Sequence, residues 1–195
     1  MKDGFLDISK INKLSPEKGS VLISEPFMTD EHFKRSVVYL CEHNEDGSFG
    51  FVLNNFLDIS LFELVEDIVN EEFKVSFGGP VSPDNLFYVH TLKDELNGSY
   101  EVMPGLYTGG KFEDLIPLIN TGVITPNEIR FFLGYSGWEA GQLDTELSVS
   151  SWIVGKTTVR RVLNTNDKHL WKKILDEMGG KFKMISNFPE DPSLN

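Results

Sequence analysis

The sequence predicts a single α+β domain, residues 1–195, with a mostly antiparallel sheet that curls partly toward a barrel. Two observations lead to this class. Short apolar segments follow one another across glycine-containing turns, which is typical of antiparallel neighbours. Helical segments are scattered between them, without the regular alternation of strand and helix that predicts a doubly wound sheet. A chain of 195 residues is long enough for one sizeable core.

Strands are expected where β-branched and aromatic residues lie between turn residues. The clearest hairpin joins SVVYLCEH to GSFGFVLN, because Asp46-Gly47 suits a turn that needs positive φ. SVLISEP is expected to be a buried strand that ends at Pro26. The other expected strands are KVSFGGPV, NLFYVHTL, one or two short strands in GSYEVMPGLYTGG, NEIRFFLGYS, SSWIVG and TTVRRVL.

The clearest predicted helix is SLFELVEDIVNEEF, residues 60–73. Ser60 and Glu63 match a capping box, and the apolar residues that follow recur at helical spacing. Further helices are expected in FEDLIPLINTG, WEAGQLDTEL and NDKHLWKKILDEMGG, the last of them closed by Gly179. Residues 1–18 form an N-terminal extension with a short docking helix, and residues 187–195 form a polar tail.

The charge and the cysteine content limit the classes of function. The net charge is −12, and the acidic excess lies in residues 1–150, so the surface should repel a phosphate backbone. Direct nucleic-acid binding is therefore not expected. The lone Cys41 excludes an internal disulfide, and the N-terminus lacks the apolar block of a signal peptide. Without an apolar run of ~18 residues, we expect a cytoplasmic protein with no membrane segment.

The segment GYSGWEAGQLDTEL, residues 134–147, allows two interpretations. In the structural interpretation, Ser136 and Glu139 form a capping box where a strand turns into a helix. In the functional interpretation, the free amides of that helix start favour an anion, with Gln142 and Glu146 on one helical face. A nucleophile elbow is not supported, because Trp138 replaces its second glycine.

The sequence offers little support for a metal or cofactor site. Cys41, His43 and His90 are three candidate ligands where zinc prefers four, and no paired spacing supports them. The glycine corner FGGPV matches no phosphate-binding loop, so backbone turning is its expected role. Arg35 is expected to pair with Glu25 or Glu42, or to hold a ligand anion. No metal and no cofactor are predicted.

Several of these motifs occur together in one family. The sequence resembles the AlgH/YqgE family of bacterial proteins over nearly its whole length, from about Gly19 onward. The motifs that carry the resemblance are F-K-R-S-V (33–37), His43 before a glycine hairpin, G-x-x-L-N (50–54), G-G-P-V (78–81) and G-W-x-x-G-Q-L (137–143). The resemblance implies a bifurcated, partly barrel-like sheet surrounded by helices. It implies no settled activity; relatives are often labelled transcriptional regulators. Lys111 follows Gly109-Gly110 where many relatives have an acid.

The hypothesis that follows is a cytoplasmic binding or regulatory protein, leaning away from an enzyme, that acts through a small anionic ligand or a protein partner. With no helix-turn-helix pattern, we do not expect direct DNA binding as its mode of regulation. An enzyme on a small anionic substrate, or a scaffold with an acidic face, remain alternatives. The candidate surface comprises Arg35, His43, Asn54, Gly78, Gly79, Pro80, His90, Ser136, Trp138, Gln142 and Glu146.

Overall fold

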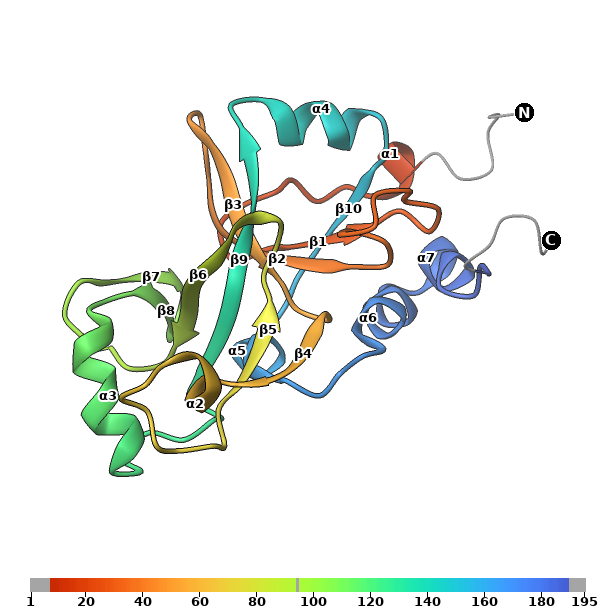
Figure 1. Cartoon of the computed structure of the whole chain (residues 1–195). Helices are drawn as coiled ribbons and strands as arrows, with labels where there is room; N and C mark the ends of the chain where they lie inside the picture. Colours follow the sequence, from red (N-terminus) through yellow and green to blue (C-terminus); the bar gives the residue numbers. More distant parts are fainter. Residues whose placement is uncertain (1–7, 94, 190–195) are drawn as a thin grey trace.

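A ten-stranded sheet, curled into a half-barrel, organises the protein, and helices pack around its margins (Figure 1). The computed structural model describes residues 8–93 and 95–189. The strands are β1 (Val21–Ser24), β2 (Val37–Asn44), β3 (Gly47–Val52), β4 (Phe56–Ser60), β5 (Lys74–Phe77), β6 (Val81–His90), β7 (Ser99–Met103), β8 (Leu106–Gly109), β9 (Ile129–Glu139) and β10 (Trp152–Gly155). The helices are α1 (Ile8–Ile11), α2 (Leu61–Leu64), α3 (Phe112–Asn120), α4 (Gln142–Ser148), α5 (Val159–Leu163), α6 (Leu170–Met178) and α7 (Gly180–Ile185). The predicted α+β class and the mostly antiparallel sheet are confirmed.

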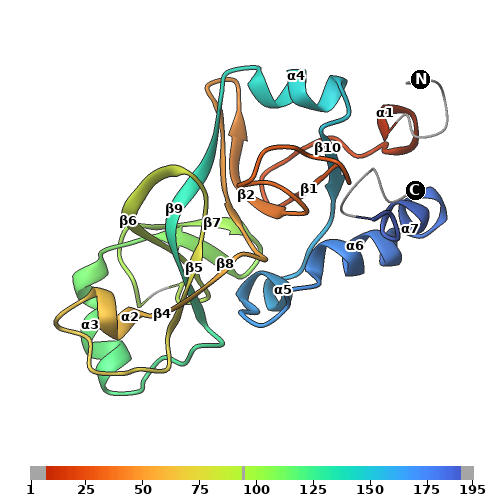
Figure 2. The same ribbon diagram turned by 45° about the vertical axis from the view of Figure 1, so that its right-hand side comes forward.

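The long strand β9 joins two groups of strands and makes the sheet bifurcate (Figure 2). Its first half lies between β6, which is antiparallel to it, and β5, which is parallel to it. Its second half leaves β5 and pairs with β3, so that Phe49 lies opposite Gly137. From β3 the sheet continues through β2 and β1 to β10. The order follows antiparallel neighbours except at the β5–β9 pair.

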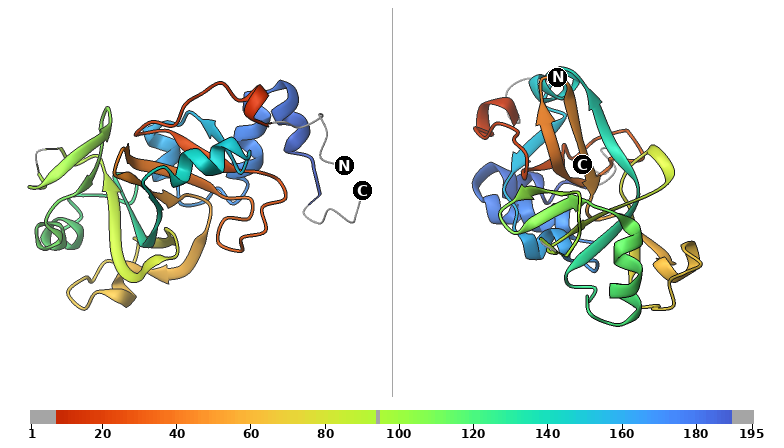
Figure 3. Two further views of the ribbon diagram at one scale, coloured as in Figure 1. Left: turned by 90° about the horizontal axis from the view of Figure 1, so that it is seen from above. Right: turned by 90° about the vertical axis from the view of Figure 1, so that its left-hand side faces the viewer.

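The apolar core divides into three clusters, which different helices cover. One packs Trp171 of α6 and Ile185 of α7 against β1, β2 and β3. The second packs Leu115 of α3 against β5, β6 and β9. The third contains Trp138 and Trp152 beneath α4. As a result α3 lies at the opposite end of the protein from α6 and α7 (Figure 3).

The long helix predicted for residues 60–73 is wrong beyond its first turn, since α2 ends at Leu64. The capping interaction itself is present, because the Ser60 amide donates to the Glu63 carboxylate at 2.9 Å. Asp67 follows Glu63 by four residues, so a continued helix would place two like charges together. The side chain of Asn120 instead donates to the Asp67 carbonyl at 2.8 Å and holds a turn.

The strand predicted for TTVRRVL is also wrong, because these residues form the short helix α5. The Thr158 hydroxyl accepts from the Arg161 amide at 3.3 Å and caps the first turn. Val162 and Leu163 are buried, and they place the helix against the sheet. Of the β-branched residues that indicated a strand, Thr158 therefore caps the helix and Val162 lies on its buried face. The helix α7 was not predicted.

The structure describes only part of each end of the chain. The docking helix is present as α1, and Ile8 is buried in the main core cluster. Within the predicted polar tail, Phe188 stacks on Phe27 with ring centroids 5.7 Å apart. Residues 1–7 and 190–195 lie outside the described part. No described helix is both long and apolar enough to cross a membrane.

Candidate functional site

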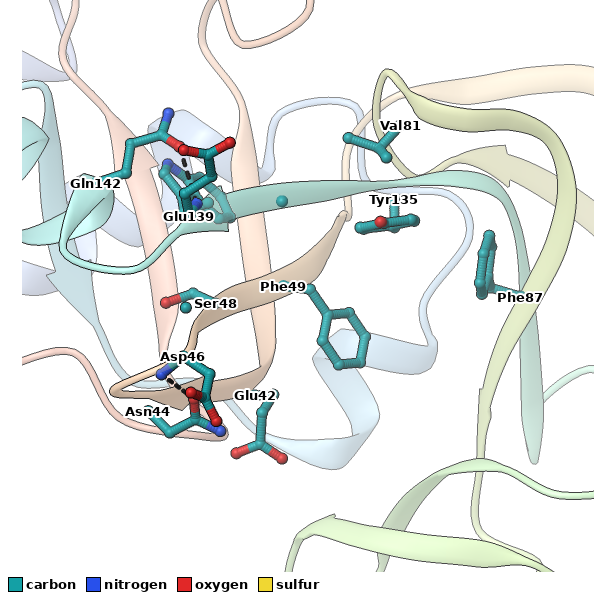
Figure 4. A pocket seen from close by; sticks show the side chains of 13 residues that line it. Glu42, Asn44, Asp46, Ser48, Phe49, Val81, Phe87, Tyr135, Glu139 and Gln142 are labelled. Carbon is teal, nitrogen blue, oxygen red and sulfur yellow. Dashed lines mark hydrogen bonds between the residues drawn. The ribbon is translucent and has the colours of Figure 1, made fainter.

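An open groove of about 830 Å³ lies on the face of the sheet formed by β2, β3 and the end of β9 (Figure 4). The strand β6 supplies one wall and the start of α4 supplies part of the rim. The lining residues are Glu42, Asn44, Asp46, Gly47, Ser48, Phe49, Val81, Phe87, Tyr135, Gly137, Trp138, Glu139 and Gln142.

Strand alternation puts most of these side chains on one face of the sheet, whereas Ser48 and Trp138 point to the other face. Tyr135, Gly137 and Glu139 are two residues apart on β9, so they point to the same side of the sheet. Phe49 on β3 lies directly opposite Gly137. Because Gly137 has no side chain, the space in front of the Phe49 ring stays open. Val81 pairs with Tyr135, and the register between β6 and β9 then shifts.

Three half-buried rings form the apolar wall of the groove. Tyr135 meets Phe49 with ring centroids 6.1 Å apart and an interplanar angle of 85°. It meets Phe87 at 5.5 Å and 73°. Both phenylalanines also touch Phe51, which is fully buried. The wall is therefore the exposed end of the core, and its rings are held in position by packing.

Carboxylates occupy the other margins of the groove. Figure 4 shows Glu42 and Asp46 on the β2–β3 side and Glu139 near Gln142. The Gln142 side chain accepts a hydrogen bond from the backbone amide of Glu139 at 2.9 Å. This bond does not involve the Glu139 carboxylate. No described residue makes a hydrogen bond or ion pair with these three carboxylates. No lysine or arginine is among the lining residues, so the groove is negatively charged.

The predicted capping box at Ser136 and Glu139 is wrong. The strand β9 runs on through Glu139, and α4 begins only at Gln142, after Gly141 with φ of 72°. The Ser136 side chain is fully buried, and its hydroxyl donates to the Gly78 carbonyl at 3.0 Å. Pairing with β3 keeps β9 extended past Gly134 and Gly137, the glycines that indicated a corner.

Behind the groove, Glu146 joins two tryptophans. One carboxylate oxygen accepts from the Trp138 indole at 2.9 Å and from the Trp152 indole at 2.7 Å. The other oxygen accepts from the Gln142 amide at 3.0 Å. The two indoles meet edge to face at 5.8 Å. This network fixes α4, and with it Gln142 at the rim, onto the sheet.

We expect Glu146→Ala to lower the free energy of unfolding by about 2 kcal/mol, because both indole N–H groups lose their acceptor. Urea unfolding followed by tryptophan fluorescence measures the change. Asp144→Ala, an exposed acid on the same helix, is the control and should cost well under ~1 kcal/mol. Equal stability of the Glu146 variant and the wild type would contradict this structural role.

The glycine corner supports the groove from behind. Gly79 has φ of 152°, and an added Cβ would lie 2.3 Å from the Tyr135 backbone, so only glycine fits. The carbonyl of Gly78 receives the Ser136 hydroxyl. Pro80 follows and is exposed. These residues hold the turn between β5 and β6 close to β9, and none of them lines the groove.

Asn54 and Arg35 lie away from the groove. The Asn54 side chain accepts from the Val37 amide and donates to the Arg35 carbonyl, each at 2.8 Å, and so clamps the turn before β2. The Arg35 guanidinium lies 4.7 Å over the Trp171 ring and donates to the Phe188 carbonyl.

The expected ion pair of Arg35 with Glu25 or Glu42 is wrong within the described residues. The Glu25 carboxylate accepts from the Phe27 amide at 3.0 Å. Glu42 belongs to the far end of β2, seven residues from Arg35 in sequence. At ~3.3 Å per residue in a strand, that separation is too long for contact.

The two strand histidines occupy different environments. His43 Nδ1 lies 2.7 Å from the Ser48 hydroxyl, next to the groove. His90 is fully buried at the other end of β6. Its Nδ1 accepts from the Leu92 amide at 3.1 Å, and its Nε2 lies 3.2 Å from both the Gly109 carbonyl and the Ser99 hydroxyl. His90 therefore serves the fold. No described group of His, Cys, Asp and Glu residues has the arrangement of a metal site.

Burial lowers the pKa of His90 below 6.5, opposed by its hydrogen bond to the Gly109 carbonyl. Below pH 6.5, the unfolded chain therefore binds a proton at this histidine more readily than the folded protein does. Stability should be fully present above pH 6.5 and fall as the pH drops below it. Urea unfolding between pH 5 and 7.5 tests this. His90→Gln should show a shallower pH slope, and an unchanged slope would contradict the prediction.

Several groove residues were missed by sequence reasoning. Phe49, Phe87 and Tyr135 belong to predicted strands, but nothing local indicated that their rings meet. Glu42 was expected to pair with Arg35 and Glu139 to cap a helix, so neither was placed on the candidate surface. The signal available was alternation along each strand, which assigns a face but not the neighbours on it.

Comparisons with known proteins identify related sequences. A family model described as AlgH-like matches residues 21–183. A UPF0301 protein of Bacteroides thetaiotaomicron is 41% identical over 192 residues, 97% of each chain. One of Chlorobium limicola is 38% identical and covers 96% of this chain and 100% of its own.

Solved structures show the same architecture. The solution structure of the AlgH protein from Pseudomonas aeruginosa has a TM-score of 0.71 at 28% identity, covering 91% of this chain and 97% of that one. A crystal structure of a Corynebacterium diphtheriae protein has a TM-score of 0.75 at 22% identity, covering 93% and 97%.

Proposed function

The chain belongs to the AlgH-like family, and from this premise we propose that it is a cytoplasmic binding or regulatory protein that holds a ligand or a protein partner in the groove on β2, β3 and β9. The groove itself is the observation that supports the proposal. Its volume of about 830 Å³ is in the range of known ligand sites. Its rings are positioned by the core, and its carboxylates make no hydrogen bond or ion pair with a described residue.

Direct DNA binding is not favoured by this surface. The groove carries Glu42, Asp46 and Glu139 without a lysine or arginine, and the whole chain has a net charge of −12. Such a surface repels phosphates. Regulation would then act through the bound ligand or partner. The small anionic ligand expected from the sequence stays a prediction, and the charge of this groove does not support it.

The enzyme alternative has one favourable observation. The Ser48 hydroxyl and His43 Nδ1 lie 2.7 Å apart, as in a nucleophile and its base, but they point to the face of the sheet opposite Phe49. The other groups suggested for catalysis do not join them. Arg35 and His43 flank opposite ends of β2, and the Glu146 carboxylate is occupied by two indoles. We therefore place binding before catalysis.

Native mass spectrometry of the protein, purified gently from its native host, tests the proposal. We expect a retained ligand or partner mass that is lost in Gly137→Leu. The added side chain would start 3.1 Å from the edge of the Tyr135 ring and occupy space in the groove. Val123→Leu, at an exposed position far from the groove, should retain the mass.

A bare wild-type chain, or a mass retained equally by the Gly137 variant, would contradict the proposal. Salt-sensitive binding to duplex DNA at micromolar protein would contradict the exclusion of DNA. Circular dichroism checks that the Gly137 variant folds; if it does not, Phe87→Leu, which removes one ring of the groove wall, should lower the retained mass instead.

A further inference from the structure

The occupant of the groove can be specified from the lining. The rings of Phe49 and Phe87 each stand nearly perpendicular to the Tyr135 ring, at 85° and 73°. Aromatic faces attract cations within about 6 Å of the ring centroid, by ~0.5–1 kcal/mol at exposed sites and more when water is excluded. The rings therefore suit a group that is both flat or apolar and positively charged.

The carboxylates complement the same kind of group. Glu42, Asp46 and Glu139 lie along the margins of the groove, and none of them makes an ion pair with a described residue. Carboxylates held near one another without a counterion favour a bound cation. A guanidinium can donate two parallel hydrogen bonds to a carboxylate while its plane stacks on a ring, which an ammonium cannot do.

Elsewhere in the protein, two arginine guanidinium groups lie over aromatic rings. The Arg35 guanidinium lies 4.7 Å over the Trp171 ring, and the Arg130 guanidinium lies 5.0 Å over the Phe132 ring. The groove has rings of the same kind without a guanidinium of its own. Its volume, about 830 Å³, is larger than one small cation needs and has room for several residues of a chain.

We infer that the groove binds an arginine-bearing segment of a protein partner, with a guanidinium seated over the Tyr135 and Phe87 rings and hydrogen-bonded to Glu42, Asp46 or Glu139. The inference rests on the proposed function, since it names the chemistry of the occupant of the same groove. The partner surface is basic and extended, which matches the negative charge and the open side of the groove.

The probe is a fluorescein-labelled peptide, Gly-Arg-Gly-Arg-Gly-Arg, measured by fluorescence anisotropy at low ionic strength. Peptides with lysine or glutamine in place of arginine are compared with it. We expect binding in the order arginine, lysine, glutamine, with at least about a fivefold difference between arginine and lysine. Added salt should weaken the binding.

Two matched triple variants locate the binding. Glu42→Gln, Asp46→Asn and Glu139→Gln together should raise Kd at least about tenfold. Glu31→Gln, Glu71→Gln and Glu72→Gln remove the same charge from exposed positions outside the groove and should change Kd less than about twofold. Phe87→Leu should weaken binding about threefold by removing one ring face.

The first triple variant creates no cavity, so it carries the test even if Phe87→Leu folds poorly. Equal losses in both triple variants would overturn the inference, because bulk charge would then explain binding. Tighter binding of the lysine peptide or of spermidine would overturn it too. If no arginine peptide binds, while wild type retains a host mass that Gly137→Leu loses, the inference fails and the proposed function stands.

Discussion

Replacing Arg130 by methionine should lower the free energy of unfolding by about 3 kcal/mol or more, because it leaves buried acceptors without a donor. Arg130 is fully buried on β9. Its guanidinium donates to the carbonyls of Leu53 at 2.7 Å and of Val162 and Asn164 at 2.8 Å. It also donates to the Ser76 hydroxyl at 3.0 and 3.3 Å. One side chain thus joins the end of β3, β5 and the helix α5.

The charge of Arg130 is kept despite its burial. Burial lowers the pKa of Arg130 to about 9, which still leaves the group protonated at neutral pH. No described carboxylate pairs with it, and the rings of Phe56 and Phe132 lie 5.4 and 5.0 Å from the guanidinium. Oriented carbonyls and ring faces therefore replace a counterion. Methionine fills the space but cannot donate to these acceptors.

The matched control for Arg130 is Arg161→Met on α5. Arg161 makes an ion pair with Glu177 at 2.8 Å in which the glutamate side chain is 56% exposed. Such surface pairs contribute about 0–1 kcal/mol. Urea unfolding of both variants is the measurement. A midpoint for Arg130→Met that equals the midpoint of the control would show that these hydrogen bonds do not stabilise the fold.

Gly78→Ala should cost on the order of 3 kcal/mol or prevent folding, because the added methyl group has no room. Its Cβ would lie 2.2 Å from the Gly134 carbonyl oxygen. The backbone cannot move aside easily, since the Gly78 amide donates to the Leu133 carbonyl at 2.8 Å. The Gly78 carbonyl accepts from the Val52 amide at 2.9 Å and the Ser136 hydroxyl at 3.0 Å.

Gly122→Ala is the comparison for Gly78. Gly122 has φ of 69° and no atom within 4 Å of an added Cβ, so only its conformation resists the change. That conformation costs an alanine about 1 kcal/mol. Thermal and urea unfolding of both variants separate crowding from backbone strain. A Gly78 variant that is no less stable than the Gly122 variant would mean that the crossing with β9 can relax.

Local rules predicted the elements that are decided by neighbouring residues. The hairpin at Asp46-Gly47, the break at Pro104 and the end of α6 at Gly179 depend on φ and on missing amide hydrogens, which are properties of the residues themselves. The same rules failed for residues 60–73 and TTVRRVL. There, the Asn120 side chain and the burial of Val162 opposed the local preference.

The predicted candidate surface was brought together only in part. Trp138 and Gln142 line the groove, Glu146 lies behind them, and His43 contacts the lining residue Ser48. Arg35, Asn54 and His90 lie elsewhere: Arg35 precedes β2 and Asn54 follows β3, where the two side by side form one turn, and His90 ends β6. Motif order along the chain contained no information about which strand ends meet.

The sequence by itself determined the α+β class, the family resemblance, the acidic charge and the turns, because each depends on composition, on short-range chemistry or on motif order. Only the tertiary structure decided that Phe49, Phe87 and Tyr135 share one wall, and that Arg130 is enclosed by carbonyls from distant segments. Both depend on the register of β9 with its neighbours. A shift of one residue would turn each side chain to the other face, and long-range packing alone selects between those registers.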